Sequence, residues 1–364
     1  MSAGADSHET AGRPESLLDR FKNLRRLDVE VATRAAIATA IPLIILVVLG
    51  RIDWAAYASF GAMTALYGRG EPYRIRLRTV SVGALGLLVS ILLGIGMAVS
   101  GASLLVLTLG LILVIAAGLM LAAAVGLFPP TPILFVFAYA VCAQAPTPPA
   151  EIWSRMLVAV IAAAFAWTLT MSGWLIRRAA VDARTGTFKT LPRQSHVRAA
   201  ALGDSRVWLA IGQNVIGVLI AGGLAIAVGI GHPYWAVVSV VAVIPPPRAA
   251  HSISRAIHRI IGTAGGVLVT GLILLPGAPV WVLVAVIAIC QFGAEILVGK
   301  HYGAALLFVT PLALTVAHLA SPVAVSTLLV DRVVETALGG GIAIVIVLIT
   351  RAIVNRRNAR ASVA

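Results

Sequence analysis

No Asp, Glu, Lys or Arg occurs between residues 79 and 150. A globular domain in water carries charged groups at much shorter intervals, so this run excludes a soluble cytoplasmic enzyme. The whole chain has the same character, because 60% of its 364 residues are hydrophobic, 12% are charged and the mean hydropathy is +0.98. Helices satisfy their own backbone hydrogen bonds in lipid, so the sequence predicts an all-α, polytopic membrane protein.

The apolar residues fall into twelve segments. A helix needs about 20 apolar residues to cross a bilayer, and most of the segments reach that length. The second, fifth and eighth are short enough to be partial or re-entrant spans. The predicted limits are 31–50, 54–68, 79–100, 102–127, 131–146, 151–176, 208–231, 234–247, 260–276, 279–298, 302–319 and 327–350.

The positions of the 28 Lys and Arg residues predict the orientation of the chain. With the N-terminus in the cytoplasm, only Arg51, Arg155 and Arg332 fall on the outer side, as the positive-inside rule requires. We therefore expect a multi-pass protein of the inner (plasma) membrane, in contact with the lipid bilayer and with both termini cytoplasmic. The net charge of +14 reflects these cytoplasmic turns and does not indicate nucleic-acid binding.

A basic stretch divides the chain nearly in half, and features on its two sides correspond. Trp54 and Trp235 each open a short segment, and Arg155 and Arg332 each stand at the outer start of a sixth segment. Since six is even, the two repeats would be parallel, with a symmetry axis along the membrane normal. The predicted organisation is an N-terminal cytoplasmic tail (1–30), a first six-helix repeat (31–176), a basic cytoplasmic linker (177–207), a second six-helix repeat (208–350) and a basic cytoplasmic tail (351–364).

Motifs in the second half carry a family resemblance. The quoted residues are His232-Pro233-Tyr234-Trp235, Pro245-Pro246-Pro247-Arg248, Arg259-Ile260-Ile261-Gly262-Thr263 with Gly265-Gly266, Gln291, Glu295, Tyr302, Thr310-Pro311, Arg332, Thr336 and Gly339. In this order and spacing they resemble the fusaric acid resistance family, also called the aromatic acid exporter family. The resemblance covers residues 208–350 well and 31–176 only as a diverged repeat.

The resemblance implies an inner-membrane efflux transporter of small organic anions, often aromatic carboxylic acids, driven by the proton gradient. Plant malate channels are distant relatives, so a passive organic-anion channel is one alternative, and a non-transporting membrane scaffold is another. Many family members carry a sizeable cytoplasmic domain after each membrane half, whereas the linker and tail here are short. Substrate identity, the coupling ion and homo-oligomer formation stay open.

The sequence contains no recognisable catalytic or metal-binding motif. It lacks a glycine-rich phosphate loop ending in Lys-Ser or Lys-Thr, and it lacks a His-Glu-x-x-His pattern. The two cysteines, Cys142 and Cys290, lie in apolar segments, so a disulfide framework is not expected. We predict a protein that is not an enzyme and needs no cofactor or metal.

Two arginines near the outer membrane surface are the first candidates for substrate binding. An arginine at the centre of a span costs roughly 2.5–3.5 kcal/mol, so it persists where it is paired or functional. Arg155 and Arg332 could ring the outer mouth of a central pathway and attract an anion. Alternatively, each pairs with a carboxylate neighbour on its own helix, Glu151 for Arg155 and Glu335 for Arg332, and extends toward the headgroups.

Glu295 is the candidate for proton coupling, because it lies in an otherwise uncharged segment and could take up and release protons. The alternative is an interfacial ion pair with Lys300. His318 and Glu335 are weaker candidates for a proton relay.

The short second and eighth segments predict the position of the substrate site, since interrupted spans at matching positions often build a transporter's binding centre. The aromatic residues of these segments could offer faces to the solute, or they could belong to an interfacial aromatic belt; they are Trp54, Tyr57, Tyr234 and Trp235. Arg78 and Arg259, in the basic stretches that follow, could form a vestibule that collects anions, or they could anchor the helices to anionic lipid.

Overall fold

The computed structural model describes residues 26–179, 202–229, 231, 233–245 and 252–361. The predictions for residues 1–25, for the linker residues 180–201 and for Pro246 to His251 lie outside the described residues. Of the described residues 85% are helical, and they contain no strand. The predicted all-α fold is confirmed.

In the described residues, twelve α-helices follow one another in the order of the twelve predicted segments. Nine of these helices in the described residues are long and apolar enough to cross a membrane. Their bounds are α2 (Arg26–Val48), α3 (Ala55–Ala62), α4 (Tyr73–Ser100), α5 (Leu104–Val125), α6 (Ile133–Gln144), α7 (Ile152–Ala179), α8 (Ser205–Ala227), α9 (Tyr234–Val243), α10 (Ser252–Leu274), α11 (Val280–Leu297), α12 (Tyr302–Ala320) and α13 (Val325–Ala361).

The three remaining helices are the ones that the sequence marks as short. Helices α3, α6 and α9 have 8, 12 and 10 residues. At about 1.5 Å per residue they cover roughly 12–18 Å, which is about half of the hydrocarbon core. None of the three can cross the bilayer alone.

The first and last helices extend beyond the limits predicted from hydropathy. Helix α2 begins at Arg26 rather than near residue 31, and α13 continues to Ala361 rather than ending near residue 350. The added residues are rich in Arg, Ala, Asp and Glu, which are compatible with a helix but too polar to count toward an apolar span.

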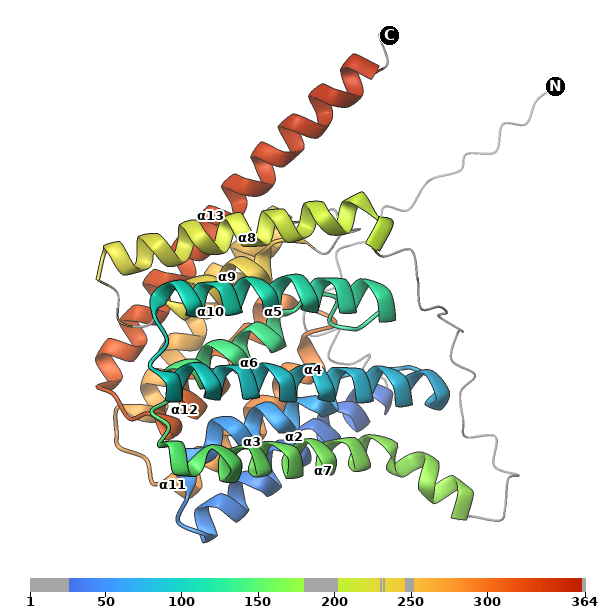
Figure 1. Cartoon of the computed structure of the whole chain (residues 1–364). Helices are drawn as coiled ribbons and strands as arrows, with labels where there is room; N and C mark the ends of the chain where they lie inside the picture. The colour runs from blue at the N-terminus through green and yellow to red at the C-terminus, as the bar shows by residue number, and fades with distance from the viewer. Residues whose placement is uncertain (1–25, 180–201, 230, 232, 246–251, 362–364) are drawn as a thin grey trace, which may run out of the picture.

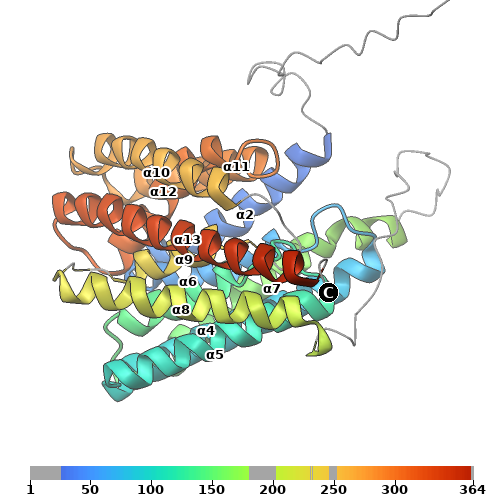
Figure 2. The same ribbon diagram turned by 90° about the horizontal axis from the view of Figure 1, so that it is seen from above.

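The bundle has two ends, which we name for the chain connections found there. The linker end is where α5 and α7 finish and where α4 and α8 begin, and the far end is where α4 and α8 finish and where α5 and α7 begin (Figure 1). Seen at right angles, α10, α11 and α12 lie at one edge, and α4 and α5 lie at the opposite edge (Figure 2). Helices α6 and α9 lie between these edges.

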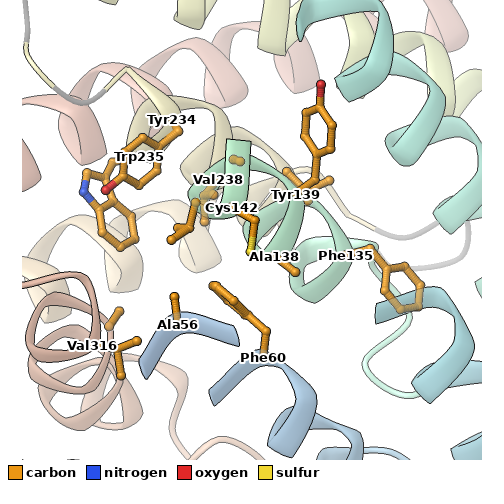
Figure 3. Close-up of a cluster of buried hydrophobic side chains, with 14 of the residues drawn as sticks. Ala56, Phe60, Phe135, Ala138, Tyr139, Cys142, Tyr234, Trp235, Val238 and Val316 are labelled. Carbon is orange, nitrogen blue, oxygen red and sulfur yellow. The ribbon is translucent and has the colours of Figure 1, made fainter. Parts of the chain in front are cut away.

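The centre of the bundle is built from short helices of both halves. All residues of α3 and α9 are buried, as expected for helices that are apolar on every side. Helix α3 contacts α6 and α12, and α6 contacts α9. Figure 3 shows side chains of this core, with Phe60 of α3, Trp235 of α9 and Val316 of α12 gathered around one region.

Helix contacts recur between the two halves. Helix α3 packs on α7 as α9 packs on α13, and α4 packs on α6 as α10 packs on α12. Across the halves, α2 packs on α11, and α8 packs on α5. The first helix of each half therefore contacts the fourth helix of the other. Two six-helix repeats remain our interpretation of the chain, and this recurrence is consistent with it.

A substitution at Gly339 can test the close packing of α9 on α13. A Cβ atom at Gly339 would overlap the carbonyl oxygen of Ala236 and lie 2.9 Å from Cβ of Ser239, whereas a Cβ atom at Gly341 would meet nothing within 4 Å. We expect Gly339→Ala to destabilise the protein by about 1–3 kcal/mol. Gly341→Ala on the same helix is the matched control. Thermal unfolding in detergent measures both, and equal melting temperatures would contradict the packing.

Candidate functional site

A cavity of about 570 Å³ lies between the two halves of the molecule. Its wall is mostly apolar and comes from α2, α3, α6, α9, α10, α11, α12 and α13, together with the residues after α3 and the loop before α6. The loop residue Phe128 is about half exposed, so the cavity reaches the surface at the linker end. In the other direction it ends at Trp235 and Val316 in the centre of the bundle. Its volume suits a small organic ligand.

Arg332 and Trp235 form the deep end of the cavity. Trp235 is fully buried and Arg332 is 1% exposed, and both line the cavity. Cζ of Arg332 lies 3.9 Å from the centroid of the Trp235 ring, a cation–π contact. Trp235 also packs on Phe137, with ring centroids 5.1 Å apart, and Phe137 meets Phe60 at 5.0 Å. Stacking on Trp235 fixes the plane of the guanidinium and leaves its edge free for hydrogen bonds.

A second buried arginine stands beside this pair. Arg259 of α10 is 2% exposed, and its Nη1 donates a hydrogen bond to the hydroxyl of Tyr302 at 3.2 Å. Arg255 stacks on the same tyrosine ring at 4.3 Å, and its Nε donates to the carbonyl of Ala242 in the last turn of α9. Tyr302 therefore orients Arg259, while Arg255 satisfies a carbonyl at the end of the short helix.

Several donors at the deep end have no acceptor. Within the described residues, Nε and Nη1 of Arg332, Nε of Arg259 and Nε1 of Trp235 are buried without a hydrogen-bond partner. Leaving a buried donor unsatisfied costs about 1–3 kcal/mol, and more when the group is charged. The charges of Arg332 and Arg259 also lie close enough to act on each other. An anionic acceptor in the cavity would satisfy the donors and offset the repulsion.

An ionic network lies at the rim of the cavity at the linker end. Nη1 of Arg69 donates to the main-chain oxygen of Glu295 at 2.8 Å and to its carboxylate at 3.2 Å. Nη2 of the same arginine donates to Asp28 at 3.1 Å, and Asp28 also pairs with Lys300 at 3.4 Å. Arg69 lies between Gly68 and Gly70, both at positive φ, a conformation that favours glycine. The network joins α2, α11 and the loop after α3.

Arg155 lies outside this cavity and is fully engaged elsewhere. Its Nε and Nη2 donate to Glu151 at 3.0 and 2.8 Å, the pairing that the sequence offers as an alternative. Its Nη1 donates to the Tyr57 hydroxyl, to the Pro146 carbonyl and to the Thr147 hydroxyl at 2.7–2.9 Å. Glu151 in turn accepts from Arg51 at 2.7 Å. Arg155 therefore joins α3 and α7 at the far end.

Trp54 and Arg78 also lie away from the cavity. Trp54 belongs to the far-end cluster around Arg155, because Arg51 stacks on its ring at 3.7 Å and its Nε1 donates to Glu151 at 3.4 Å. Arg78 is exposed, and its Nη2 donates to the carbonyl of Val125 at the end of α5.

Tyr234, Glu335 and His318 lie around the deep end without lining the cavity. Tyr234 packs on Trp235 and lines a separate pocket of about 120 Å³ on its far-end side. Glu335 is fully buried, and its charge acts on Arg332. Nδ1 of His318 is buried and has no hydrogen-bond partner within the described residues.

Of the residues proposed from the sequence, Arg332, Trp235, Arg259 and Glu295 thus meet in one cavity. Sequence reasoning missed Arg69 as a site residue and assigned no role to Tyr302. Their partners come from distant parts of the chain, and a single sequence carries no signal for such contacts. In the described parts of the chain, no group of three or more His, Cys, Asp or Glu residues could hold a metal ion.

Comparison with known proteins adds one finding. Residues 218–346, from within α8 to within α13, match a family model. The family is described as fusaric acid resistance protein-like. The match to this fusaric acid resistance protein-like family covers about a third of the chain, and Trp235, Arg259, Glu295 and Arg332 all lie inside it. The predicted resemblance is confirmed for these residues, and it indicates membrane transport. No curated protein and no solved structure matches the chain.

Proposed function

We propose that this protein exports small organic anions, with aromatic carboxylic acids as the preferred class, through the central cavity. The observation that carries the proposal is the convergence of unsatisfied donors from Arg332, Arg259 and Trp235 at the deep end. A carboxylate can accept two hydrogen bonds from one guanidinium in a bidentate pair and further bonds from its neighbours. Arg155, Trp54 and Arg78, which lie elsewhere, are not needed for this role.

The shape and chemistry of the cavity favour an amphipathic anion. Phe60, Phe137 and Leu134 contribute to its apolar wall, whereas the unsatisfied cationic donors lie at the deep end. An anion with an apolar body and one acidic head would fill both regions, because burying apolar area gains roughly 25 cal/mol per Å² and the head would satisfy the arginines.

The proposed direction of transport rests on the predicted orientation, which places the linker end in the cytoplasm. The cavity reaches the surface at that end. At the other end, Trp235, Phe137 and Val316 separate the cavity from the small pocket lined by Tyr234, Val141 and Ala317. The arrangement would admit an anion from the cytoplasm, and release to the outside would require this apolar layer to open.

We further propose that Glu295 couples export to the proton gradient. It lines the cavity and holds Arg69, so protonation of its carboxylate would weaken the tie between α11 and the loop after α3. A proton could then pass to Glu335, which lies beside Arg332, or to His318.

Glu295→Gln should reduce proton-coupled export while expression stays intact, because the amide keeps the size and hydrogen bonding of the carboxyl but cannot titrate. The measurement is export across a series of external pH values, with Glu30→Gln on the exposed face of α2 as the control. A pH profile identical to that of the parent protein would contradict proton coupling and leave Glu295 with only a structural role in its ion pair.

The test of the function compares cells with and without the protein, using a panel of labelled carboxylates and an uncoupler. We expect aromatic acids to accumulate outside against their gradient and the uncoupler to abolish the accumulation. A passive channel would instead give ohmic anion currents in planar bilayers without accumulation. A membrane scaffold would give neither result.

A further inference from the structure

Two more arginines are buried at the linker end and do not line the transport cavity. Arg34 lies about two turns into α2 and is 7% exposed, and Arg76 lies in the first turn of α4 and is 5% exposed. Helices α2 and α4 both pack on Met63–Leu66, the short turn that follows α3, and a Cβ atom at Gly68 would come within 2.7 Å of the Arg76 side chain. Neither arginine lines the cavity.

Three nitrogen atoms of these arginines lack a hydrogen-bond partner within the described part of the chain. Nε and Nη2 of Arg34 and Nε of Arg76 are buried without a hydrogen-bond partner. Among the charged groups that act on Arg34, the strongest is Arg76, a like charge. Two guanidiniums are thus held close together in a protein interior, an arrangement that is costly unless an anion joins them.

The neighbouring acids do not fill this role. Glu30 is exposed on α2, and Glu295 is engaged by Arg69. Glu71, in the loop before α4, acts on Arg76, but its Oε2 is buried without a hydrogen-bond partner among the described residues, so this oxygen does not accept from either arginine. Tyr73 acts on Arg34, and Cζ of Arg76 lies 4.8 Å from the centroid of its ring, so its aromatic face is in contact with Arg76.

We propose that Arg34 and Arg76 form a binding site for a phosphate oxyanion, separate from the transport cavity. A phosphate group presents several acceptor oxygens at tetrahedral angles, so it can bridge guanidiniums that approach from two helices. The free N–H groups in the first turn of α4 add positive partial charge at the same place. The phosphate belongs either to an anionic lipid headgroup at the membrane surface or to a free phosphate compound.

The test measures thermal unfolding of the purified full-length protein in detergent. The probes are phosphatidylglycerol, zwitterionic phosphatidylcholine, inorganic phosphate and benzoate, at constant ionic strength. A ligand that binds only the folded state raises the melting temperature. We expect phosphatidylglycerol, inorganic phosphate or both to raise it, and Arg34→Gln and Arg76→Gln to lose most of the rise. Arg74→Gln, an exposed arginine in the same turn of α4, is the matched control and should keep it.

The source of the phosphate follows from the probes. A rise with phosphatidylglycerol alone assigns a lipid headgroup, a rise with inorganic phosphate alone assigns a free phosphate compound, and a rise with both assigns a site that accepts either. A rise with benzoate alone would overturn the proposal, and so would equal rises in Arg34→Gln, Arg76→Gln and Arg74→Gln.

The variants without ligand give an independent check. Because removal of one like charge relieves repulsion, Arg34→Gln should melt at or above the temperature of the parent protein in phosphate-free detergent. A clear drop would show that Arg34 is paired inside the protein and would overturn the proposal. Arg34→Lys keeps the charge but loses the bidentate donors, so it should fold and show a smaller ligand-induced rise. The proposal does not rest on the transport function, so either can fail alone.

Discussion

Replacing Arg332 with alanine should bring carboxylate transport close to background while the protein still folds. Two of its guanidinium nitrogens have no acceptor among the described residues. These nitrogens therefore contribute little to the stability of the fold, and their main contribution is to the affinity for a bound anion. A charge-assisted hydrogen bond contributes about 1.5–3 kcal/mol, which corresponds to roughly 10- to 150-fold in affinity. Arg332→Lys keeps the charge without the bidentate geometry and should fall between the parent protein and Arg332→Ala.

The measurement pairs transport with thermal stability in the same purified variants. Arg206→Ala, an exposed arginine at the start of α8, controls for a general loss of positive charge. A stability loss large enough to account for the whole transport loss would defeat the binding role. Arg332 would then be a structural partner of its acidic neighbours, as the alternative interpretation of the sequence holds.

The helices could be predicted from the sequence because lipid imposes a simple rule on apolar runs. Each of the twelve predicted segments corresponds to one helix, and the three segments marked as short are the three helices too short to span the bilayer. The polar ends of helices are not predicted by this rule, because they are not apolar. Hydropathy does not register the first turns of α2 or the last turns of α13, although these residues form helix equally well.

The partners of the charged residues could not be predicted in the same way. Neighbours on one helix are visible in the sequence, and the Arg155 pair with Glu151 was among the stated alternatives. Lys300 is near Glu295 in the chain, yet Glu295 pairs with Arg69, 226 residues away. Arg34 was visible as an arginine inside an apolar segment, but its proximity to Arg76 depends on the path of the loop between them.

The two halves use corresponding positions for different purposes. Each places an arginine of its sixth helix over an aromatic ring of its short second helix, Arg155 over Tyr57 and Arg332 over Trp235. In the first half, the hydroxyl of Tyr57 and the neighbouring Thr147 and Glu151 satisfy the arginine. In the second half, the indole ring offers no acceptor, so Arg332 keeps donors free. The sequence symmetry therefore predicts two equivalent arginines, whereas packing leaves only Arg332 of this pair in the cavity.

This difference leads to the opposite expectation for Arg155. Arg155→Gln should lower the free energy of unfolding by about 2–4 kcal/mol, because it removes a buried partner of Glu151 and leaves Tyr57 and Thr147 without their shared donor. Arg51→Gln removes the more exposed partner of Glu151 and should lower the free energy of unfolding much less, because exposed ion pairs contribute little, which makes it the control.

Thermal unfolding in detergent measures both variants, and transport is then compared per folded molecule. We expect Arg155→Gln to transport normally once the loss of folded protein is taken into account, whereas Arg332→Ala fails even when fully folded. An Arg155→Gln protein with the parent melting temperature and no transport would place Arg155 on the substrate pathway. That result would support the hypothesis of two equivalent arginines at an outer mouth. If the fold stays intact without Arg155, the loss of transport cannot come from breaking the contacts by which Arg155 joins α3 and α7.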